Sequence, residues 1–156
     1  MFARLILLSA SSFFLFTSIS PIRAETCKPL PLVGGEGSTV TKTVSQPTIP
    51  TRFGNITNNN WNTDWAVSGG NNNFKRYVVT ITSEDDNAFD VRMYLKYSDQ
   101  TADEFFNQES VTINPSKPLK IASNPRKGTQ PYQVNLFVNG IASFGKTYTA
   151  TVMGCN

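Results

Sequence analysis

Residues 89–97, FDVRMYLKY, alternate between apolar and polar side chains over nine positions. The odd positions are all apolar or aromatic, and three of the four even positions carry a charge. Because successive side chains of a strand point to opposite faces, this period predicts a strand with one buried face and one solvated face. Phe89, Val91, Met93, Leu95 and Tyr97 are its predicted inward positions, and Asp90, Arg92, Tyr94 and Lys96 its outward ones.

The same period recurs on both sides of this stretch. FKRYVVTIT (74–82) precedes it, and the polar turn SEDDNA predicts a hairpin between the two. PYQVNLFVNG (131–140) places Tyr132, Val134, Leu136 and Val138 inward, and KTYTATVMG (146–154) repeats the pattern with Tyr148, Ala150 and Val152. Residues 38–44 form a further strand candidate rich in β-branched side chains.

Two short candidates, SVTI (110–113) and PLKIAS (118–123), are bounded by prolines, which favours edge positions in a sheet. Thr101 and Glu104 have the spacing of a capping box, which predicts one helical turn. The chain is therefore expected to be all-β, a single antiparallel β-sandwich of Greek-key or jelly-roll type with about seven to nine strands. A closed barrel is the alternative.

Residues 1–24 have the pattern of an export signal: a basic start, an apolar run and small Ala24 at the end. A retained membrane anchor is the alternative, although several serines and a proline interrupt the run. Residues 25–50 form an extended Pro/Gly-rich lead-in, and 51–156 the β-sandwich domain. Removing residues 1–24 takes two of 14 basic side chains and none of the 11 acidic ones, so the net charge becomes +1.

Cys27 and Cys155 are the only cysteines and lie near the two ends of the exported chain. An even count of cysteines in an exported chain predicts one disulfide, which would bring the chain's start and end together. We also expect a monomer, without nucleic-acid partners and without a membrane span in the mature protein.

Several chemistries are excluded by composition. The chain contains no histidine, which removes His-dependent triads and most neutral-pH proton shuttles. LVGGEGST (32–39) lacks the lysine and the strand-to-helix setting of a nucleotide-binding loop. Paired carboxylates are the remaining catalytic option, as in a secreted glycan-active hydrolase. We expect no catalytic residues and no cofactor.

Calcium is the cofactor alternative. SEDDNAFD (83–90) offers oxygen ligands from Asp85, Asp86, Asn87 and Asp90, but the pattern is incomplete. A basic stretch with intervening prolines, containing Lys117, Lys120, Arg126 and Lys127, reads as a protected sheet edge. Its functional alternative is contact with an anionic polysaccharide or an acidic envelope surface. Asn55 begins a glycosylation motif.

Both tryptophans lie in an asparagine-rich stretch. Trp65 alternates with Val67 in TDWAVS (63–68), so its ring is predicted to be buried. Nothing near Trp61 argues for burial, and Trp61 with Asn59, Asn60 and Asn62 is the candidate glycan contact. We therefore expect an exported, non-enzymatic module that binds or scaffolds at the cell envelope or outside, with a glycan as candidate ligand. A pilus-type subunit that donates the strand TVTKTV (39–44) is the second alternative.

Overall fold

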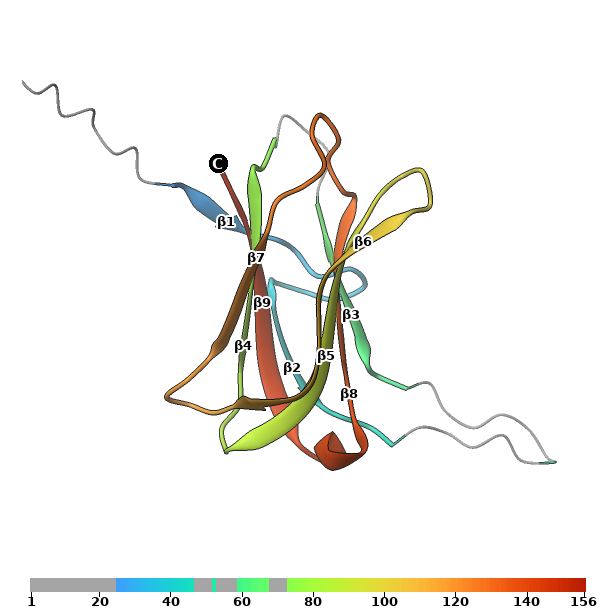
Figure 1. The fold of residues 1–156 in the computed structure, drawn as a ribbon, viewed down its shortest axis with the longest axis vertical. Coiled ribbons are helices and arrows are strands. Elements are labelled where there is room, and N and C mark those ends of the chain that lie inside the picture. Colours follow the sequence, from blue (N-terminus) through green and yellow to red (C-terminus); the bar gives the residue numbers. More distant parts are fainter. Residues whose placement is uncertain (1–24, 47–51, 53–58, 68–72) are drawn as a thin grey trace, which may run out of the picture.

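The computed structural model describes residues 25–46, 52, 59–67 and 73–156. In this part of the chain, nine strands form two antiparallel sheets that face each other (Figure 1). The strands are β1 (Cys27–Pro29), β2 (Thr39–Thr43), β3 (Asn62–Ala66), β4 (Arg76–Thr82), β5 (Asn87–Lys96), β6 (Ala102–Ile113), β7 (Leu119–Ser123), β8 (Gln133–Asn139) and β9 (Thr147–Cys155). The predicted β-sandwich is confirmed, with two separate sheets in place of a closed barrel.

Sheet A has the order β1–β9–β4–β7, and β2 also pairs with β9. Sheet B has the order β3–β8–β5–β6. The lead-in residues 25–46 thus contribute two strands to sheet A, and the C-terminus lies beside β1 in Figure 1. The two Pro-bounded candidates lie at sheet edges, one as β7 and the other as the end of β6.

The predicted hairpin between β4 and β5 is wrong, because β4 belongs to sheet A and β5 to sheet B. Residues 83–86 cross from one sheet to the other. An alternating pattern tells which face of a strand is apolar, and that face is buried equally well by a hairpin or by a crossing between facing sheets.

The predicted helical turn is also wrong. Thr101 precedes β6, and Glu104 lies within β6 opposite Tyr94 of β5. The Thr101 hydroxyl donates to Asp99 at 2.5 Å and does not cap a helix. Pairing of β6 with the long strand β5 overrides the local capping signal.

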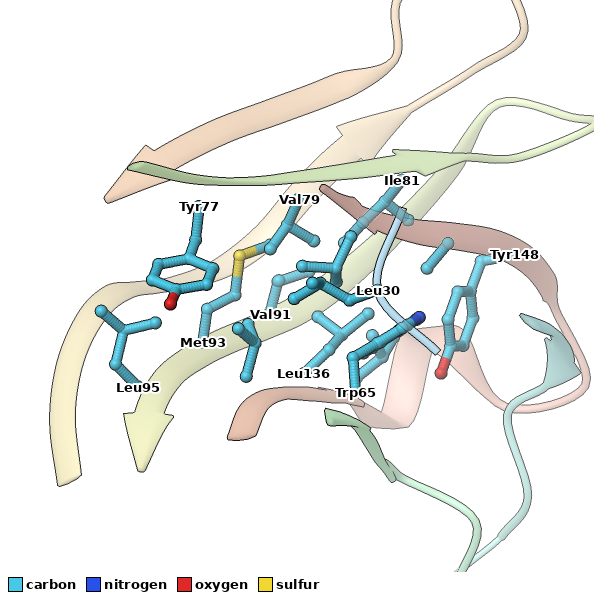
Figure 2. Close-up of a cluster of buried hydrophobic side chains, with 14 of the residues drawn as sticks. Leu30, Trp65, Tyr77, Val79, Ile81, Val91, Met93, Leu95, Leu136 and Tyr148 are labelled. Carbon is cyan, nitrogen blue, oxygen red and sulfur yellow. The ribbon is translucent and has the colours of Figure 1, made fainter. Parts of the chain in front are cut away.

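The core lies between the sheets and contains side chains from both (Figure 2). The inward residues predicted for residues 89–97 are all buried, as are Val134, Leu136, Val138 and the inward residues of β9. Tyr77 and Tyr148 lie toward opposite ends of the cluster in Figure 2. Burial raises the pKa of Tyr77 and raises that of Tyr148 to about 12.

Of two aromatic side chains predicted to be buried, Trp65 is buried and Tyr132 is exposed. Trp65 is fully buried, and its indole N–H donates to the Ser38 carbonyl at 2.9 Å, which confirms the prediction. Tyr132 was expected to point inward but is 47% exposed. Tyr132 is two residues before the inward Val134, so alternation predicts that it points inward. However, β8 begins only at Gln133, and alternation does not extend to residues before the strand.

Residues 31–35 and β2 close one flank of the sandwich. Leu32 forms an antiparallel bridge with Trp65, and the Val33 N–H donates to the Asp64 carbonyl at 2.9 Å. Lys42 reaches from β2 toward β3, where its ammonium donates to the Asn62 carbonyl at 2.8 Å and the Asn60 carbonyl at 3.2 Å. The edges of the two sheets are therefore joined along this flank.

The predicted disulfide is confirmed: Cys27 and Cys155 are bridged and are also paired residues of β1 and β9. No helix in the described residues is both long enough and apolar enough to cross a bilayer. The signal segment 1–24 and Asn55 lie outside the described residues, and both stay predictions.

Candidate functional site

Aromatic, amide and charged side chains, which are the kinds that bind ligands, lie side by side on the outward side of sheet B. Two adjacent cross-strand rows run over it. One row is Asp64, Asn135, Tyr94 and Glu104, and the other is Asn62, Phe137, Arg92 and Asn107. We call these eight residues, with Lys96, the sheet B face. On β3, β5 and β8 these positions alternate with buried ones, so the pleat places them on the outer side, and Glu104 and Asn107 of β6 share that side because they pair with Tyr94 and Arg92.

The centre of the sheet B face is held by a polar network. The Asn135 amide is buried and donates to Asn62 Oδ1 at 3.2 Å and to Asp64 Oδ1 at 3.0 Å. Lys96 donates to the same Asp64 oxygen at 2.8 Å. Two side chains from neighbouring strands, Asn135 of β8 and Lys96 of β5, thus fix the orientation of one carboxylate.

A second network lies on the β5–β6 side. Tyr94 donates to Glu104 Oε2 at 2.7 Å, and Asn107 donates to Glu104 Oε1 at 3.0 Å. The hydrogen bond from Tyr94, followed by that from Asn107, lowers the pKa of Glu104. The same bond to Glu104, together with burial, raises the pKa of Tyr94. Glu104 is therefore an anionic acceptor at neutral pH, and it orients the Tyr94 ring.

Phe137 is the second ring of the sheet B face and is half-buried. Trp61 contacts it edge-on, with ring centroids 5.9 Å apart. The Arg92 guanidinium carbon lies 5.8 Å from the Phe137 centroid, within the range of a cation–π contact. Arg92 is exposed, and no carboxylate of the described residues lies within ion-pair distance of it.

A cavity of about 280 Å³ adjoins the sheet B face at the β3 edge. It lies between residues 32–35, β2 and β3, and its polar lining is Lys42, Asn62, Thr63 and Asp64. We call it the flank pocket. Burial lowers the pKa of Lys42, and the nearby Asp64 carboxylate partly opposes this shift.

The structure separates the four predicted glycan-contact residues. Asn60 and Trp61 belong to the joined flank: the Asn60 amide donates to Thr43 O at 2.6 Å, and the Trp61 indole donates to Ser45 O at 2.8 Å. Nothing in the sequence near Trp61 argues for burial, but the ring is half-buried and packs against the core. Asn62 lies on the sheet B face, and Asn59 is exposed before β3. Of the four, Asn62 is the one on the sheet B face.

The other residues of the sheet B face were not singled out from the sequence as binding residues. One signal was present, because Phe137 and Tyr94 are aromatic residues at positions where alternation calls for polar ones. The position of Lys42 had no such signal, since its carbonyl partners on Asn60 and Asn62 lie 18 and 20 residues away.

The candidate calcium ligands lie at and beside the β4–β5 connection. Asp85 and Asp86 are exposed, whereas Asn87 is buried and its amide donates to Ser83 at 2.8 Å. Asp90 accepts a hydrogen bond from the Ser110 N–H at 2.9 Å. In the described residues, the one group of three acidic or cysteine side chains close enough to share an ion is Glu25, Cys27 and Cys155, whose cysteines are bridged.

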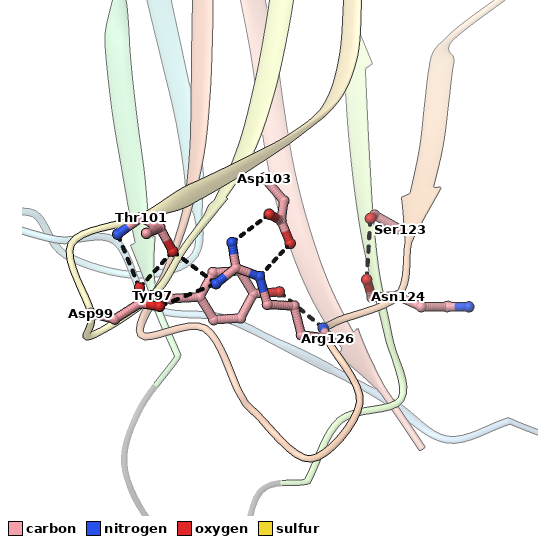
Figure 3. Close-up of polar contacts among 7 residues, drawn as sticks. All are labelled: Tyr97, Asp99, Thr101, Asp103, Ser123, Asn124 and Arg126. Carbon is pink, nitrogen blue, oxygen red and sulfur yellow. Dashed lines mark hydrogen bonds and ion pairs between the residues drawn. The ribbon is translucent and has the colours of Figure 1, made fainter.

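Arg126 is the most constrained of the four predicted anion-contact residues. Its guanidinium stacks on the Tyr97 ring at 4.0 Å, binds both oxygens of Asp103 and contacts Asp99 at 3.3 Å (Figure 3). Arg126 and Lys127 line a shared cavity of about 470 Å³, which Lys117 and Lys120 do not reach. The charge of Arg126 is thus used to join the β7–β8 loop to the β5–β6 hairpin.

Arg126→Ala is expected to lower the melting temperature at pH 7, with a difference from the parent that shrinks in acid. The hydrogen bonds from Arg126 lower the pKa of Asp103 from 3.8. A carboxyl with a lowered folded pKa stabilises the fold above its unfolded pKa, and this stability is lost as the pH falls through the folded value. Thermal melts followed by circular dichroism at pH 7 and across the range below pH 4 check this. Lys127→Ala is the matched control and should change little; a difference that is constant with pH would assign the effect to stacking on Tyr97.

Three carboxylates lack the tuning that the acid of a glycosidase requires. Such an enzyme needs one carboxyl with a raised pKa, which acts as the acid. The pKa values of Asp99, Asp103 and Glu104 are lowered instead, the first by hydrogen bonds from Thr101 and the others by those from Arg126 and Tyr94. None of these three is suited to protonating a leaving group.

No protein-family model and no curated protein sequence matches the chain. Among solved structures, a mutant of the family 29 carbohydrate-binding module CBM29-2 is similar, with a TM-score of 0.45 and 7% identity over 85% of this chain and 92% of that one. The CBM22-1 xylan-binding domain of Xyn10C from Paenibacillus barcinonensis has a TM-score of 0.32 and 8% identity, over 86% of each chain. These neighbours are carbohydrate-binding modules. Similarity at this level assigns no ligand to the present chain.

Proposed function

We propose that this chain is a non-catalytic glycan-binding module whose ligand lies across the sheet B face. The two cross-strand rows are the observation that carries the proposal, because they place rings, amides and charged groups side by side. A sugar presents apolar C–H patches and hydroxyl groups that both donate and accept. Tyr94 and Phe137 supply apolar ring surface for the former, and Asn62, Asn107 and Arg92 supply polar groups for the latter.

Preorganisation supports the same proposal. The Asn135–Asp64–Lys96 and Tyr94–Glu104–Asn107 networks hold these side chains before any ligand arrives. A ligand therefore has little side-chain entropy to remove at this surface, which favours binding by weak individual contacts.

The alternatives have less support. The hydrolase would need a carboxyl with a raised pKa, and the shifted carboxyls move the other way. The pilus-type subunit would donate residues 39–44, but residues 39–43 are β2 and pair with β9 of the same chain. We also propose export, to which residues 1–24 and the disulfide point.

Affinity electrophoresis in gels containing neutral and acidic polysaccharides tests the proposal, with isothermal titration against the corresponding oligosaccharides. We expect at least one polysaccharide to retard the oxidised protein. Tyr94→Ala and Phe137→Ala should each weaken this binding about tenfold, or ~1.4 kcal/mol. Tyr132→Ala, an exposed aromatic residue outside the sheet B face, is the matched control and should bind as the parent does. Folding of each variant is checked by circular dichroism. Retardation by none of the polysaccharides, or binding indifferent to both substitutions, would refute the proposal.

A further inference from the structure

The flank pocket holds polar groups whose hydrogen-bonding capacity the protein does not use up. The Lys42 ammonium donates to two backbone carbonyls, at 2.8 and 3.2 Å, and an ammonium has a third N–H. Thr63 also lines the pocket, but its hydroxyl has almost no exposed surface and lies near the buried Tyr148 hydroxyl, so it faces the core. Asp64 Oδ1 accepts from Lys96 and Asn135, whereas no described residue donates to Asp64 Oδ2.

The unused groups have a definite chemistry. A polar side chain in a cavity lining whose hydrogen-bonding capacity is not used up offers a place for a polar ligand atom. Lys42 supplies a donor and Asp64 an acceptor. Because the ammonium and the carboxylate line one cavity, a simple anion or cation meets a like charge there. Two neighbouring hydroxyl groups suit the pair, one accepting from Lys42 and the other donating to Asp64.

The size and position of the flank pocket point to one sugar ring. Its volume of about 280 Å³ lies just below the ~300 to 1,000 Å³ of usual small-molecule sites. Asn62 and Asp64 belong both to this cavity and to the sheet B face, so the two are continuous. At this edge, residues 32–33 are attached to β3 through the Leu32–Trp65 bridge and the Val33–Asp64 hydrogen bond. A glycan that crosses the face toward β3 therefore meets a wall of the protein's own chain.

We infer that the flank pocket binds the terminal sugar residue of the glycan through two adjacent hydroxyl groups, held by Lys42 and Asp64. The inference rests on the proposed function and adds to it that the protein recognises a chain end. In this inference the glycine-rich segment LVGGEGST (32–39) forms part of the sugar site, since Gly34 and Gly35 line the flank pocket together with Lys42. The sequence placed no lysine in that loop, and the fold brings one from β2.

The experiment uses methyl glycosides of glucose, mannose, galactose and xylose as probes, with inorganic phosphate as the anion probe. Binding to the oxidised protein is followed by the amide resonances of Val33, Thr63 and Asp64 in ¹⁵N-labelled protein. We expect at least one methyl glycoside to shift these resonances saturably. Asp64→Asn, which keeps the side-chain shape, and Lys42→Met should each raise its dissociation constant about tenfold. Tyr94→Ala should leave methyl glycoside binding unchanged while weakening polysaccharide binding.

Each other outcome overturns the inference. Retardation by a polysaccharide, with no methyl glycoside bound, would mean that the ligand lies on the sheet B face without its end in the flank pocket; the proposed function would then stand alone. Stronger shifts with inorganic phosphate would make the cavity an anion site. Insensitivity of methyl glycoside binding to both Asp64→Asn and Lys42→Met would place the sugar elsewhere. If neither polysaccharide nor methyl glycoside binds, the proposed function fails as well.

Discussion

Loss of the Cys27–Cys155 disulfide is expected to lower the free energy of unfolding by about 4 to 5 kcal/mol. The two cysteines are 128 residues apart, so the bridge removes much of the conformational freedom of the unfolded chain. The short strand β1 also has three paired residues and gains little from pairing alone. Urea denaturation of the oxidised protein and of the Cys27→Ser/Cys155→Ser double variant, followed by circular dichroism, measures the difference.

Lys28→Ala is the control for this experiment, because Lys28 lies within β1 and is exposed, and its replacement keeps the bridge. It should shift the urea midpoint only slightly. If the double variant unfolds at the same urea midpoint as the oxidised parent, the disulfide adds no stability beyond that of the two sheets, and the prediction is wrong.

Trp65→Ala is expected to destabilise the protein by about 3 to 5 kcal/mol. The ring is fully buried between the sheets, near Leu136 and Tyr148 in Figure 2, so its removal leaves a cavity in a small core. It also leaves the Ser38 carbonyl without its indole donor. Urea denaturation gives the loss directly.

Two other aromatic substitutions calibrate this result. Tyr132→Ala removes a 47% exposed ring and should cost little. Trp61→Ala should fall between the two, since Trp61 is half-buried and donates to Ser45. Acrylamide quenching offers a second check, because the buried Trp65 should be protected more than Trp61. Equal loss of stability on replacing Trp65 and Tyr132 would contradict the packing described here.

The sheet B face shows which features of the site alternation in the sequence can predict and which it cannot. Alternation at residues 89–97 placed Arg92, Tyr94 and Lys96 outward, and the structure agrees. It could not pair Tyr94 with Asn135 or Arg92 with Phe137, because about 40 residues separate these partners and register depends on both strands. The outward direction of these three side chains was therefore predictable from the sequence, but neither their role in a site nor their assembly with the other strands was.

The sequence by itself determined local properties of this protein: most of the strands, their apolar faces, the burial of Trp65 and the terminal disulfide. The first three follow from spacing along the chain, because side-chain direction in a strand depends only on parity, and the disulfide follows from an even cysteine count in a chain predicted to be exported. The tertiary structure decided that β4 and β5 belong to different sheets and that Glu104 lies in a strand. It also decided that Lys42 meets Asp64 in the flank pocket. These outcomes depend on long-range pairing, in which hydrogen bonds and packing between distant segments override the preferences of short ones.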